Sequence, residues 1–485
     1  MGGEHGTPRH SSPPTSDCEK TRRRRARLSH RGRATLGLLA VASLGGIALA
    51  AGLPSESEMA RVEAVASVGL PPAARQPASD APAELLERLP VSRAALELQA
   101  IVAPGVEVGS VGESGVSGRL FERVAYQGPG IRGPLRIEYT LDAELTRQVF
   151  RVLSQGRVKL GHVIVLEPGS GRVLAYASTN LEEFPPTRAY PAASLVKVIT
   201  AAAALAAHPE AAGLPCRFAG SPYRLTPARI DPPSRGITIS LRRALATSNN
   251  QCFAQLAVHA VGGGPLLEAI ARFGWLSEPA PAHAAGTADA GQDRYDVGKL
   301  GCGLGRSRIT PLHAAQLAAI LAHGELVAPR WVDRVVDAEG RELPLPAVSA
   351  PRRVISPDLA AELRAMLVDT TTRGTARSAF RKRNGRPLLG PVHVAGKTGS
   401  LSGENPTGRY EWFIGVAPAE EPRIAVATLL VQGDLWWRNA SQIAAEVLRR
   451  TFCTGRTCRP ENAERWLRAP ATTALLAPSR ADAVN

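Results

Sequence analysis

Alternating and helical hydrophobic patterns begin at residue 137 of the 485-residue chain. The run I-E-Y-T-L-D alternates like a strand, and A-E-L-T-R-Q-V-F-R-V-L follows it at helical spacing, with Asp142 in the N-cap position. Residues 162–178 then read as two strands around a Pro-Gly turn. The pattern predicts a strand, a helix and a hairpin, in that order, at the start of a folded domain.

Helical spacing dominates the middle of the chain, over residues 194–208, 241–273 and 311–323. Strand patterns return near the end of the domain, at residues 392–395, 412–418 and 423–431. This order predicts an α+β fold, in which an antiparallel sheet is built from both ends of the domain and carries a helical insertion.

The segments on either side of this domain have simpler patterns. Residues 1–34 form a basic tail, with nine Lys or Arg against three Asp or Glu among the first 33, and residues 35–53 carry no charge. This length and flanking charge predict a single transmembrane anchor with a cytoplasmic N-terminus, and a cleaved signal peptide is the alternative. We expect a linker or small N-terminal stalk at residues 54–136. The folded domain would follow at residues 137–455, and a loosely ordered C-terminal tail at residues 456–485.

The composition excludes several classes of protein. Hydrophobic residues at 44% and charged residues at 21% allow a large core, which excludes global disorder. The net charge of +15 would suit a nucleic-acid binder, but much of the excess lies in the N-terminal tail, so we expect no nucleic-acid partner. The chain has no C-x-x-C pair, which argues against a structural zinc module.

Five of the six cysteines lie in the part predicted to be exported, where disulfides can form. Cys453 and Cys458 are close enough in sequence to close a small loop. Cys216, Cys252 and Cys302 cannot be paired from sequence. We expect Cys252 and Cys302 to behave as small buried hydrophobic residues.

Three short polar elements carry the candidate chemistry. The first is S-L-V-K, Ser194 to Lys197, which opens an apolar helical run. Residues three apart share a helix face, so we expect the Lys197 amine beside the Ser194 hydroxyl. The amine could act as the base for that hydroxyl if burial lowers its pKa. Alone the motif is weak, because S-x-x-K arises by chance in many chains of this length.

The second element, S-N-N at residues 248–250, lies between two apolar helical runs. The Ser248 hydroxyl could relay a proton to a leaving amine. The Asn250 amide could hold a substrate carbonyl and orient Lys197. A turn between helices, with Ser248 as an N-cap, is the slightly better explanation when the triplet is taken alone.

The third element is K-T-G-S, Lys397 to Ser400, which we expect on an edge strand. Lys397 and Thr398 would grip a substrate carboxylate, and Gly399 would let the substrate lie against the backbone. The backbone N–H groups of Ser194 and Ser400 would form an oxyanion hole. A phosphate loop is the competing interpretation of A-G-K-T. The first glycine that a phosphate loop requires is one residue out of register here, however. A turn and a strand also follow the A-G-K-T motif, where a phosphate loop would lead into a helix.

Together, the order and context of these elements resemble the penicillin-binding transpeptidase family, serine acyltransferases that cross-link peptidoglycan. The resemblance covers about residues 137–450 and includes Y-P-A-A-S-L-V-K, A-L-A-T-S-N-N and A-G-K-T-G-S. It implies a β-lactamase-like antiparallel sheet flanked by helices, with an all-helical lobe. The site residues that it implies are Ser194 as nucleophile, Lys197 as general base, Ser248 and Asn250 in proton transfer and substrate orientation, and Lys397 with Thr398 on the carboxylate.

The implied activity is acyl transfer through a covalent intermediate on Ser194, without a metal or an organic cofactor. The donor would be a peptidoglycan stem peptide that ends in D-Ala-D-Ala, and the acceptor a neighbouring amine. β-Lactams would acylate the same serine stably. Residues 54–136 are too few for a glycosyltransferase domain, so we expect a monofunctional, class B-like enzyme. Its catalytic domain would lie outside the inner membrane, held there by a single lipid-embedded anchor and working with partners in a wall-building complex.

The sequence departs from the family pattern at two positions and leaves other activities open. Ala193 stands where many members have Gly, and Ser400 where Thr is common. A D,D-carboxypeptidase or a serine β-lactamase would use the same residues, although about 150 residues between Ser248 and Lys397 exceed the compact β-lactamase layout. A β-lactam-sensing receptor would need a signalling domain. A non-catalytic scaffold would not need to retain the complete site.

Overall fold

The computed structural model describes residues 109–111, 118–128, 131–213, 215–343, 345, 348–433 and 437–467. A five-stranded antiparallel sheet in the order β14–β15–β16–β4–β5 runs through its centre. The strands are β4 (Leu160–Leu166), β5 (Val173–Ser178), β14 (Ala395–Gly403), β15 (Gly408–Ala417) and β16 (Ile424–Gln432). Strands from both ends of the domain share this sheet, which confirms the predicted architecture.

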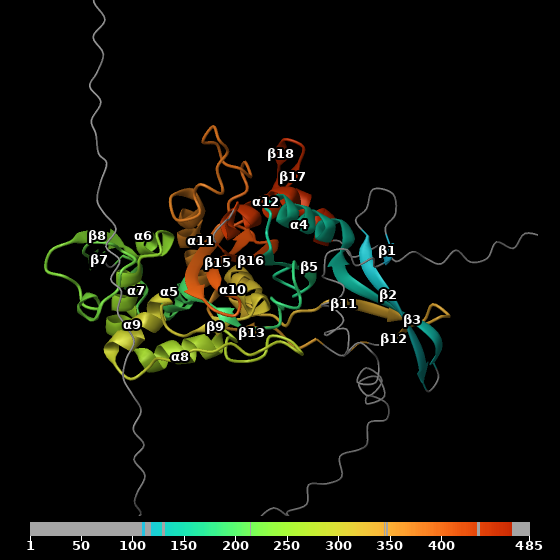
Figure 1. Ribbon diagram of the computed structural model, residues 1–485, viewed down its shortest axis with the longest axis horizontal. Coiled ribbons are helices and arrows are strands. Elements are labelled where there is room, and N and C mark those ends of the chain that lie inside the picture. The colour runs from blue at the N-terminus through green and yellow to red at the C-terminus, as the bar shows by residue number, and fades with distance from the viewer. Residues whose placement is uncertain are drawn as a thin grey trace, which may run out of the picture. The chain divides into compact units, whose positions relative to one another are not determined.

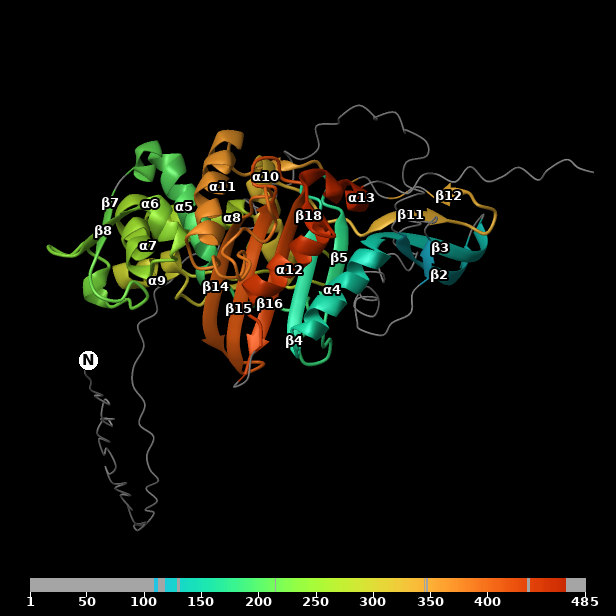
Figure 2. The ribbon, with the colours of Figure 1, turned by 90° about the horizontal axis from the view of Figure 1, so that it is seen from above.

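Helices cover both faces of the sheet (Figures 1 and 2). They are α4 (Ala143–Gln155) and α12 (Ala440–Phe452) on one face, and α10 (Pro311–His323) and α11 (Pro357–Thr372) on the other. Successive strand residues point to opposite faces, so Val163 packs in the α4–α12 core and Ile164 in the α10–α11 core. A strand buried on both faces must be apolar at nearly every position, which explains the continuous hydrophobic run of β4.

Several helices begin where the sequence supplies a cap. The Asp142 carboxylate accepts a hydrogen bond from the Leu145 N–H at the start of α4, as predicted. The Thr310 hydroxyl caps α10, and Asn439 and Gln442 form a capping box at the start of α12. The start of α12 borders the candidate site.

A helical lobe lies beside the sheet, between β5 and α10 in the sequence (Figure 1). Its elements are η1 (Ala193–Leu195), α5 (Val196–Ala207), η2 (Pro209–Ala212), β7 (Pro215–Phe218), η3 (Pro227–Arg229), β8 (Ile237–Ser240), α6 (Leu241–Ala246), α7 (Asn250–Leu256), the π-turn η4 (Ala257–Val261), α8 (Gly263–Arg272) and α9 (Arg294–Cys302). The helical pattern predicted over residues 241–273 is divided here, because the backbone takes positive φ at Ser248 (56°) and Gly262 (86°).

A second five-stranded sheet precedes and flanks the domain, in the order β1–β2–β3–β11–β12. Its strands are β1 (Gly109–Val111), β2 (Arg119–Gly128), β3 (Ile131–Asp142), β11 (Val332–Val336) and β12 (Glu342–Leu343). Part of the segment that we expected to be linker or stalk is therefore sheet. Three two-residue pairs complete the strands, β6 (Tyr190–Pro191) with β9 (Arg308–Ile309), β10 (Glu325–Leu326) with β13 (Arg352–Arg353), and β17 (Cys453–Thr454) with β18 (Thr457–Cys458).

The first part of the predicted loose tail is packed against the domain. After β18, the chain forms η5 (Pro460–Ala463) and α13 (Glu464–Leu467). The Trp466 side chain is buried, and its indole N–H donates to the Thr451 carbonyl over 3.1 Å. One aromatic anchor thus orders a segment that shows no hydrophobic period, and the folded domain extends past the boundary we predicted at residue 455.

Two disulfides cross-link the described residues. Cys453–Cys458 closes the small loop that the sequence suggested. Cys216–Cys252 corrects our expectation that Cys252 is an unpaired hydrophobic residue, because β7 lies against α7 and brings the two thiols together. Cys302 is free and buried, as expected.

The predicted basic tail and anchor, residues 1–53, lie outside the described residues. Among the helices that are described, none is both long enough and apolar enough to cross a bilayer.

Candidate active site

Ser194 and Lys197 meet at the start of α5. Lys197 Nζ lies 2.8 Å from Ser194 Oγ, as the three-residue spacing predicted. Every residue of α5 from Val196 to Ala202 is buried, so the lysine is held inside the protein with an exposed fraction of 0%. This burial lowers the pKa of the Lys197 amine from 10.5 to about 8.

The turn before Ser194 requires close backbone packing. Ala193 has φ 49°, in the left-handed region that favours glycine. Its carbonyl lies against Gly303, where an added Cβ would approach the Ala193 oxygen to 2.1 Å. Gly303 itself has φ 81°. Gly303, in the G-C-G-L-G run at residues 301–305, therefore supports the turn that presents Ser194.

Ser248 lies on the turn between α6 and α7, and Asn250 is the first residue of α7; the two residues complete the surroundings of Lys197. Lys197 Nζ lies 2.6 Å from Asn250 Oδ1, 3.0 Å from the Ser248 carbonyl oxygen and 3.1 Å from Ser248 Oγ. The Asn250 amide donates in turn to the Tyr223 carbonyl over 2.8 Å. The Ser248 φ of 56° shows that this residue shapes the turn itself; the N-cap of α7 is Asn249.

Lys397 approaches Ser248 from the edge strand β14. Its Nζ donates to Ser248 Oγ over 2.9 Å and to the Thr398 carbonyl over 2.7 Å. The Ser248 hydroxyl therefore lies between two buried amines. Burial and the nearby Lys197 charge hold the pKa of the Lys397 amine well below its usual value of 10.5. The structure thus brings Ser194, Lys197, Ser248, Asn250 and Lys397 into one hydrogen-bonded cluster.

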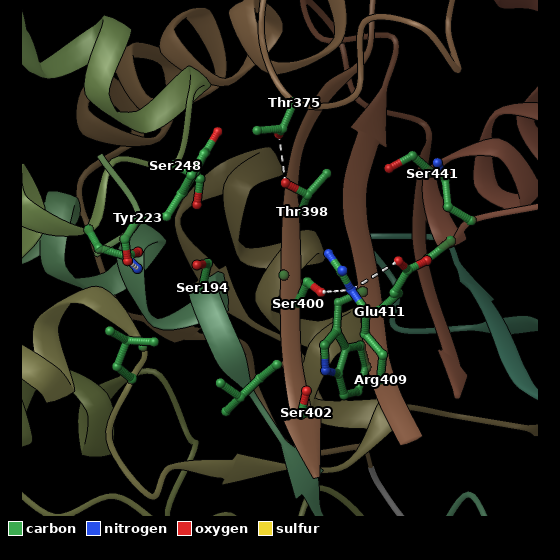
Figure 3. Close-up of a pocket in the computed structure, with 18 residues that line it drawn as sticks. Ser194, Tyr223, Ser248, Thr375, Thr398, Ser400, Ser402, Arg409, Glu411 and Ser441 are labelled. Atoms are coloured by element: carbon green, nitrogen blue, oxygen red, sulfur yellow. Dashed lines mark hydrogen bonds and ion pairs between the residues drawn. The ribbon is translucent and has the colours of Figure 1, made fainter. Parts of the chain in front are cut away.

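A cavity of about 680 Å³ opens over this cluster (Figure 3). Thr398, Gly399 and Ser400 line it along β14, which is an edge strand as predicted. The Thr398 hydroxyl is hydrogen-bonded to Thr375 over 2.6 Å, and Thr375 lines the cavity too. The two lysines are not among the lining residues and lie beneath the cavity floor.

The cavity also contains charged residues that the sequence did not single out. Arg409 Nε donates to Ser400 Oγ over 2.7 Å and lies 3.4 Å from Glu411 Oε1 (Figure 3). Glu411 is buried, which raises the pKa of its carboxyl, while the Arg409 charge opposes that shift. Both residues lie on β15, in register with Ser402 and Ser400. Once β14 and β15 are paired, strand alternation places all four side chains on one face.

Comparison with known proteins agrees with this geometry. Residues 161–452, more than half of the chain, match the penicillin binding protein transpeptidase domain family. The chain is 28% identical over 338 residues to peptidoglycan D,D-transpeptidase PbpA of Mycolicibacterium smegmatis, covering 60% of this chain and 66% of the relative. It is 30% identical over 315 residues to PbpA of Mycobacterium tuberculosis, covering 56% and 62%. The chain therefore spans just under two thirds of the length of these curated relatives.

Solved structures of penicillin-binding proteins have the same fold. The crystal structure of PBPA from M. tuberculosis superposes with a TM-score of 0.53 at 25% identity, covering 64% of this chain and 81% of that one. The penicillin G acyl-enzyme complex of the same M. tuberculosis protein superposes with a TM-score of 0.51 at 26% identity, covering 68% and 80%. Sequence match, fold and motif order agree, and the chain belongs to the penicillin-binding protein transpeptidase family.

Proposed function

We propose that the protein is a peptidoglycan D,D-transpeptidase that forms an acyl-enzyme on Ser194. The observation that carries this proposal is the 2.8 Å contact between Ser194 Oγ and the buried Lys197 amine. A pKa near 8 leaves a substantial fraction of that amine neutral at physiological pH, where it can accept the serine proton. The PbpA relatives and their acyl-enzyme structures support the same reaction class.

In the acylation step, Ser194 Oγ attacks the carbonyl between the last two residues of a D-Ala-D-Ala stem while Lys197 takes its proton. The tetrahedral oxyanion is held by the backbone N–H groups of Ser194 and Ser400. As the C–N bond breaks, Ser248 passes a proton from the amine cluster to the leaving D-Ala nitrogen. The hydrogen bonds from Lys197 and Lys397 to Ser248 Oγ provide a path for that transfer.

The leaving D-Ala carries a carboxylate that must also be held. Thr398 and Ser400 present hydroxyls on the edge strand, and Arg409 donates to Ser400 from the neighbouring strand. We assign Thr398, Gly399 and Ser400 to substrate binding and add Arg409 as a positive charge beside the carboxylate. An incoming amine then attacks the acyl-enzyme carbonyl, the ester bond to Ser194 breaks as the amide bond forms, and the proton lost by the amine returns to Ser194 Oγ through the amine cluster.

The cavity composition favours transfer to an amine over the β-lactamase alternative. Rapid hydrolysis of a β-lactam ester needs a base that activates water, such as the glutamate used by class A β-lactamases. Glu411 is the acidic side chain among the described lining residues. It lies on the face of the sheet opposite Lys397 and is paired with Arg409. Among the described residues, no carboxylate that lines the cavity is therefore placed beside Lys197 to activate water.

We also propose that residues 35–53 anchor the enzyme in the inner membrane, with the catalytic domain outside it. The uncharged run and its basic flank support this location. The disulfides Cys216–Cys252 and Cys453–Cys458 support it as well, because such bonds persist in oxidising compartments. The substrate would be peptidoglycan stem peptides and the inhibitors β-lactams. Partners in a wall-building complex would contact the parts of the chain outside the catalytic site.

The deciding experiment is the intact mass of the full chain after incubation with penicillin G, beside a Ser194→Ala control. We expect a stable adduct of one drug molecule on the parent protein and none on the control. An adduct that vanishes within seconds would indicate a β-lactamase. No adduct on folded protein would overturn the catalytic proposal and support the scaffold.

A further inference from the structure

A basic hairpin projects from the loop between α11 and β14. We use this name for Phe380–Leu388, whose arms pair through Arg381 and Pro387. The Lys382 N–H donates to the Arg386 carbonyl over 2.9 Å, and the Leu388 N–H to the Phe380 carbonyl over 2.9 Å. Gly385, with φ 79°, makes the turn at the tip. The sequence K-R-N-G-R thus forms a defined tip and not an unstructured insert.

The base of the hairpin is fixed in the core of the domain. Phe380 is buried and packs against Phe413 of β15, with ring centroids 5.3 Å apart. Leu389, just after the hairpin, is buried in the same core. The loop that follows α11 projects from the body in Figure 1. A hydrophobic base of this kind holds the charges of the tip in a constant position relative to the sheet.

The hairpin has an unusual charge pattern. No Asp or Glu occurs between Arg373 and Gly403. The five cations nearest the tip are all exposed, and none makes an ion pair within the described part of the chain; they are Arg377, Arg381, Lys382, Arg383 and Arg386. Some exposed arginines elsewhere, such as Arg341 and Arg353, have carboxylate partners. Like charges held close together repel one another, so this surface is suited to an external anion.

The hairpin is also connected directly to the candidate active site. Thr375, which lines the cavity and bonds to Thr398, is seven residues before Lys382. Seven residues of extended chain reach at most about 25 Å, which limits the distance between the cavity wall and the tip. A polymeric substrate that enters the cavity with one side branch can therefore meet the tip with another part of the same strand.

We propose that the basic hairpin binds carboxylates on stem peptides that neighbour the one in the cavity, on the same uncross-linked peptidoglycan strand. This inference rests on the proposed function and adds a second contact to it. Arg383 and Arg386 offer paired N–H donors that match a carboxylate, and Lys382 adds a point charge. The hairpin would favour strands with free stem carboxylates over short peptides and over strands whose carboxylates are amidated.

The test compares two triple variants of the full chain that lose the same charge. The first is Lys382→Gln/Arg383→Gln/Arg386→Gln, at the tip. The control changes three exposed arginines that have no ion pair among the described residues, Arg235→Gln/Arg272→Gln/Arg352→Gln. Each set is also made in the Ser194→Ala background, and binding to uncross-linked peptidoglycan strands immobilised on beads, and separately to vesicles of anionic phospholipid, is measured by co-sedimentation at low and high salt. Acylation by penicillin G is measured in the Ser194 background.

We expect the tip variant to bind the polymer about tenfold more weakly at low salt, with the difference shrinking at high salt, and to be acylated by penicillin G at the parental rate. Equal binding by both variants, or an equal loss in the control, would overturn the inference. So would a tip variant that loses binding only to vesicles of anionic phospholipid. Because binding is measured without the nucleophile, it reports on the hairpin even if Ser194 is never acylated. A failure of penicillin G to acylate Ser194 would overturn the proposed function and leave the inference about the hairpin standing.

Discussion

Two polar clusters are buried in the same core, on the α10–α11 face of the central sheet, and they differ in how their polar atoms are satisfied. At the candidate site, the Lys197 amine has four oxygen neighbours between 2.6 and 3.1 Å. In the second cluster, the His162 ring stacks on Phe184 at 4.2 Å, and neither ring nitrogen has a hydrogen-bond partner in the described structure. The Ser178 hydroxyl, paired with His162 across the strands, also has none there.

The difference shows what burial does in each place. An unpartnered buried polar group costs about 1–3 kcal/mol of stability, whereas mutually bonded groups hold one another in position. The first cluster uses burial to lower an amine pKa while keeping its geometry fixed. The second cluster carries the cost of burial without such bonds. Substitutions in the two clusters should therefore have opposite effects on activity and stability.

Removing the amine of the first cluster should have the largest effect. Lys197→Met keeps the length of the side chain but removes the base beside Ser194. We expect the rate of acylation by penicillin G to fall roughly 100- to 10,000-fold, the range typical for loss of a general base. Stopped-flow or mass-based acylation kinetics measure this rate. A loss of less than tenfold would contradict the role of Lys197, and near-native circular dichroism would confirm that the variant is folded.

Replacing the histidine of the second cluster should change acid stability instead. Burial lowers the pKa of His162 to about 3, against 6.5 in the unfolded chain. The unfolded state therefore binds more protons between these values, so stability present above pH 6.5 is lost as the pH falls towards 3. At pH 4 the loss is on the order of 3 kcal/mol. In His162→Leu, the free energy of unfolding, measured in urea at pH 7 and pH 4, should no longer show this loss. The rate of acylation at pH 7 should be unchanged.

The pH dependence of the parent protein should separate the clusters further. Because the pKa of Lys197 is about 8, the acylation rate should rise close to tenfold per pH unit from pH 6 and level off above pH 8. Stability should also rise between pH 8 and 10.5, because the unfolded lysine still binds a proton there and the buried one does not. A flat acylation profile from pH 6 to 9 would show that the neutral amine is not the base. Lys197→Met should lose only the part of this gain that Lys197 contributes, because the pKa of the buried Lys397 amine is lowered as well.

The smallest effect should come from the turn that presents Ser194. Ala193→Gly removes the Cβ from a residue at φ 49° but adds freedom to the unfolded chain. The two terms oppose each other, so we expect a stability change within about 1 kcal/mol and an acylation rate within twofold of the parent. Thermal unfolding and acylation kinetics check both. A large loss of acylation would mean that the Cβ of Ala193 itself positions Ser194.

The parts of the structure that depend on local pattern could be predicted from the sequence. The Asp142 cap and the apolar runs of β15 and β16 follow from side-chain chemistry and from the hydrophobic pattern. The apolar run near residues 392–395 overlaps β14 only at Ala395. The K-T-G-S motif lies in β14, as predicted from its chemistry, although its small and polar residues do not alternate. Edge strands are held by backbone pairing, which leaves little trace in the hydrophobic pattern.

The features that the sequence could not show depend on contacts between distant segments. Arg409 joins the site only because β15 pairs with β14 in one register. Cys216 meets Cys252 only because β7 packs on α7. The support that Gly303 gives to Ala193 likewise spans more than one hundred residues. Motif order could identify the cluster around Ser194, since each motif carries its own chemistry, but not the residues that the fold adds to it.

The Cys216–Cys252 bond has a consequence for how the site is assembled during biosynthesis. It closes a loop of 36 residues that contains Tyr223, Ser248 and Asn250 but not Ser194. Closing a loop of that length lowers the conformational entropy of the unfolded chain, which stabilises the folded state by about 4 kcal/mol. Ser194 and Lys197 therefore lie outside this disulfide loop, whereas the segment that we propose to relay the proton lies inside it and is stabilised by oxidation. The redox conditions in which the chain folds therefore affect the part of the candidate site that holds Ser248 and Asn250. In protein made in a reducing cytosol, this part of the helical lobe would lack its cross-link.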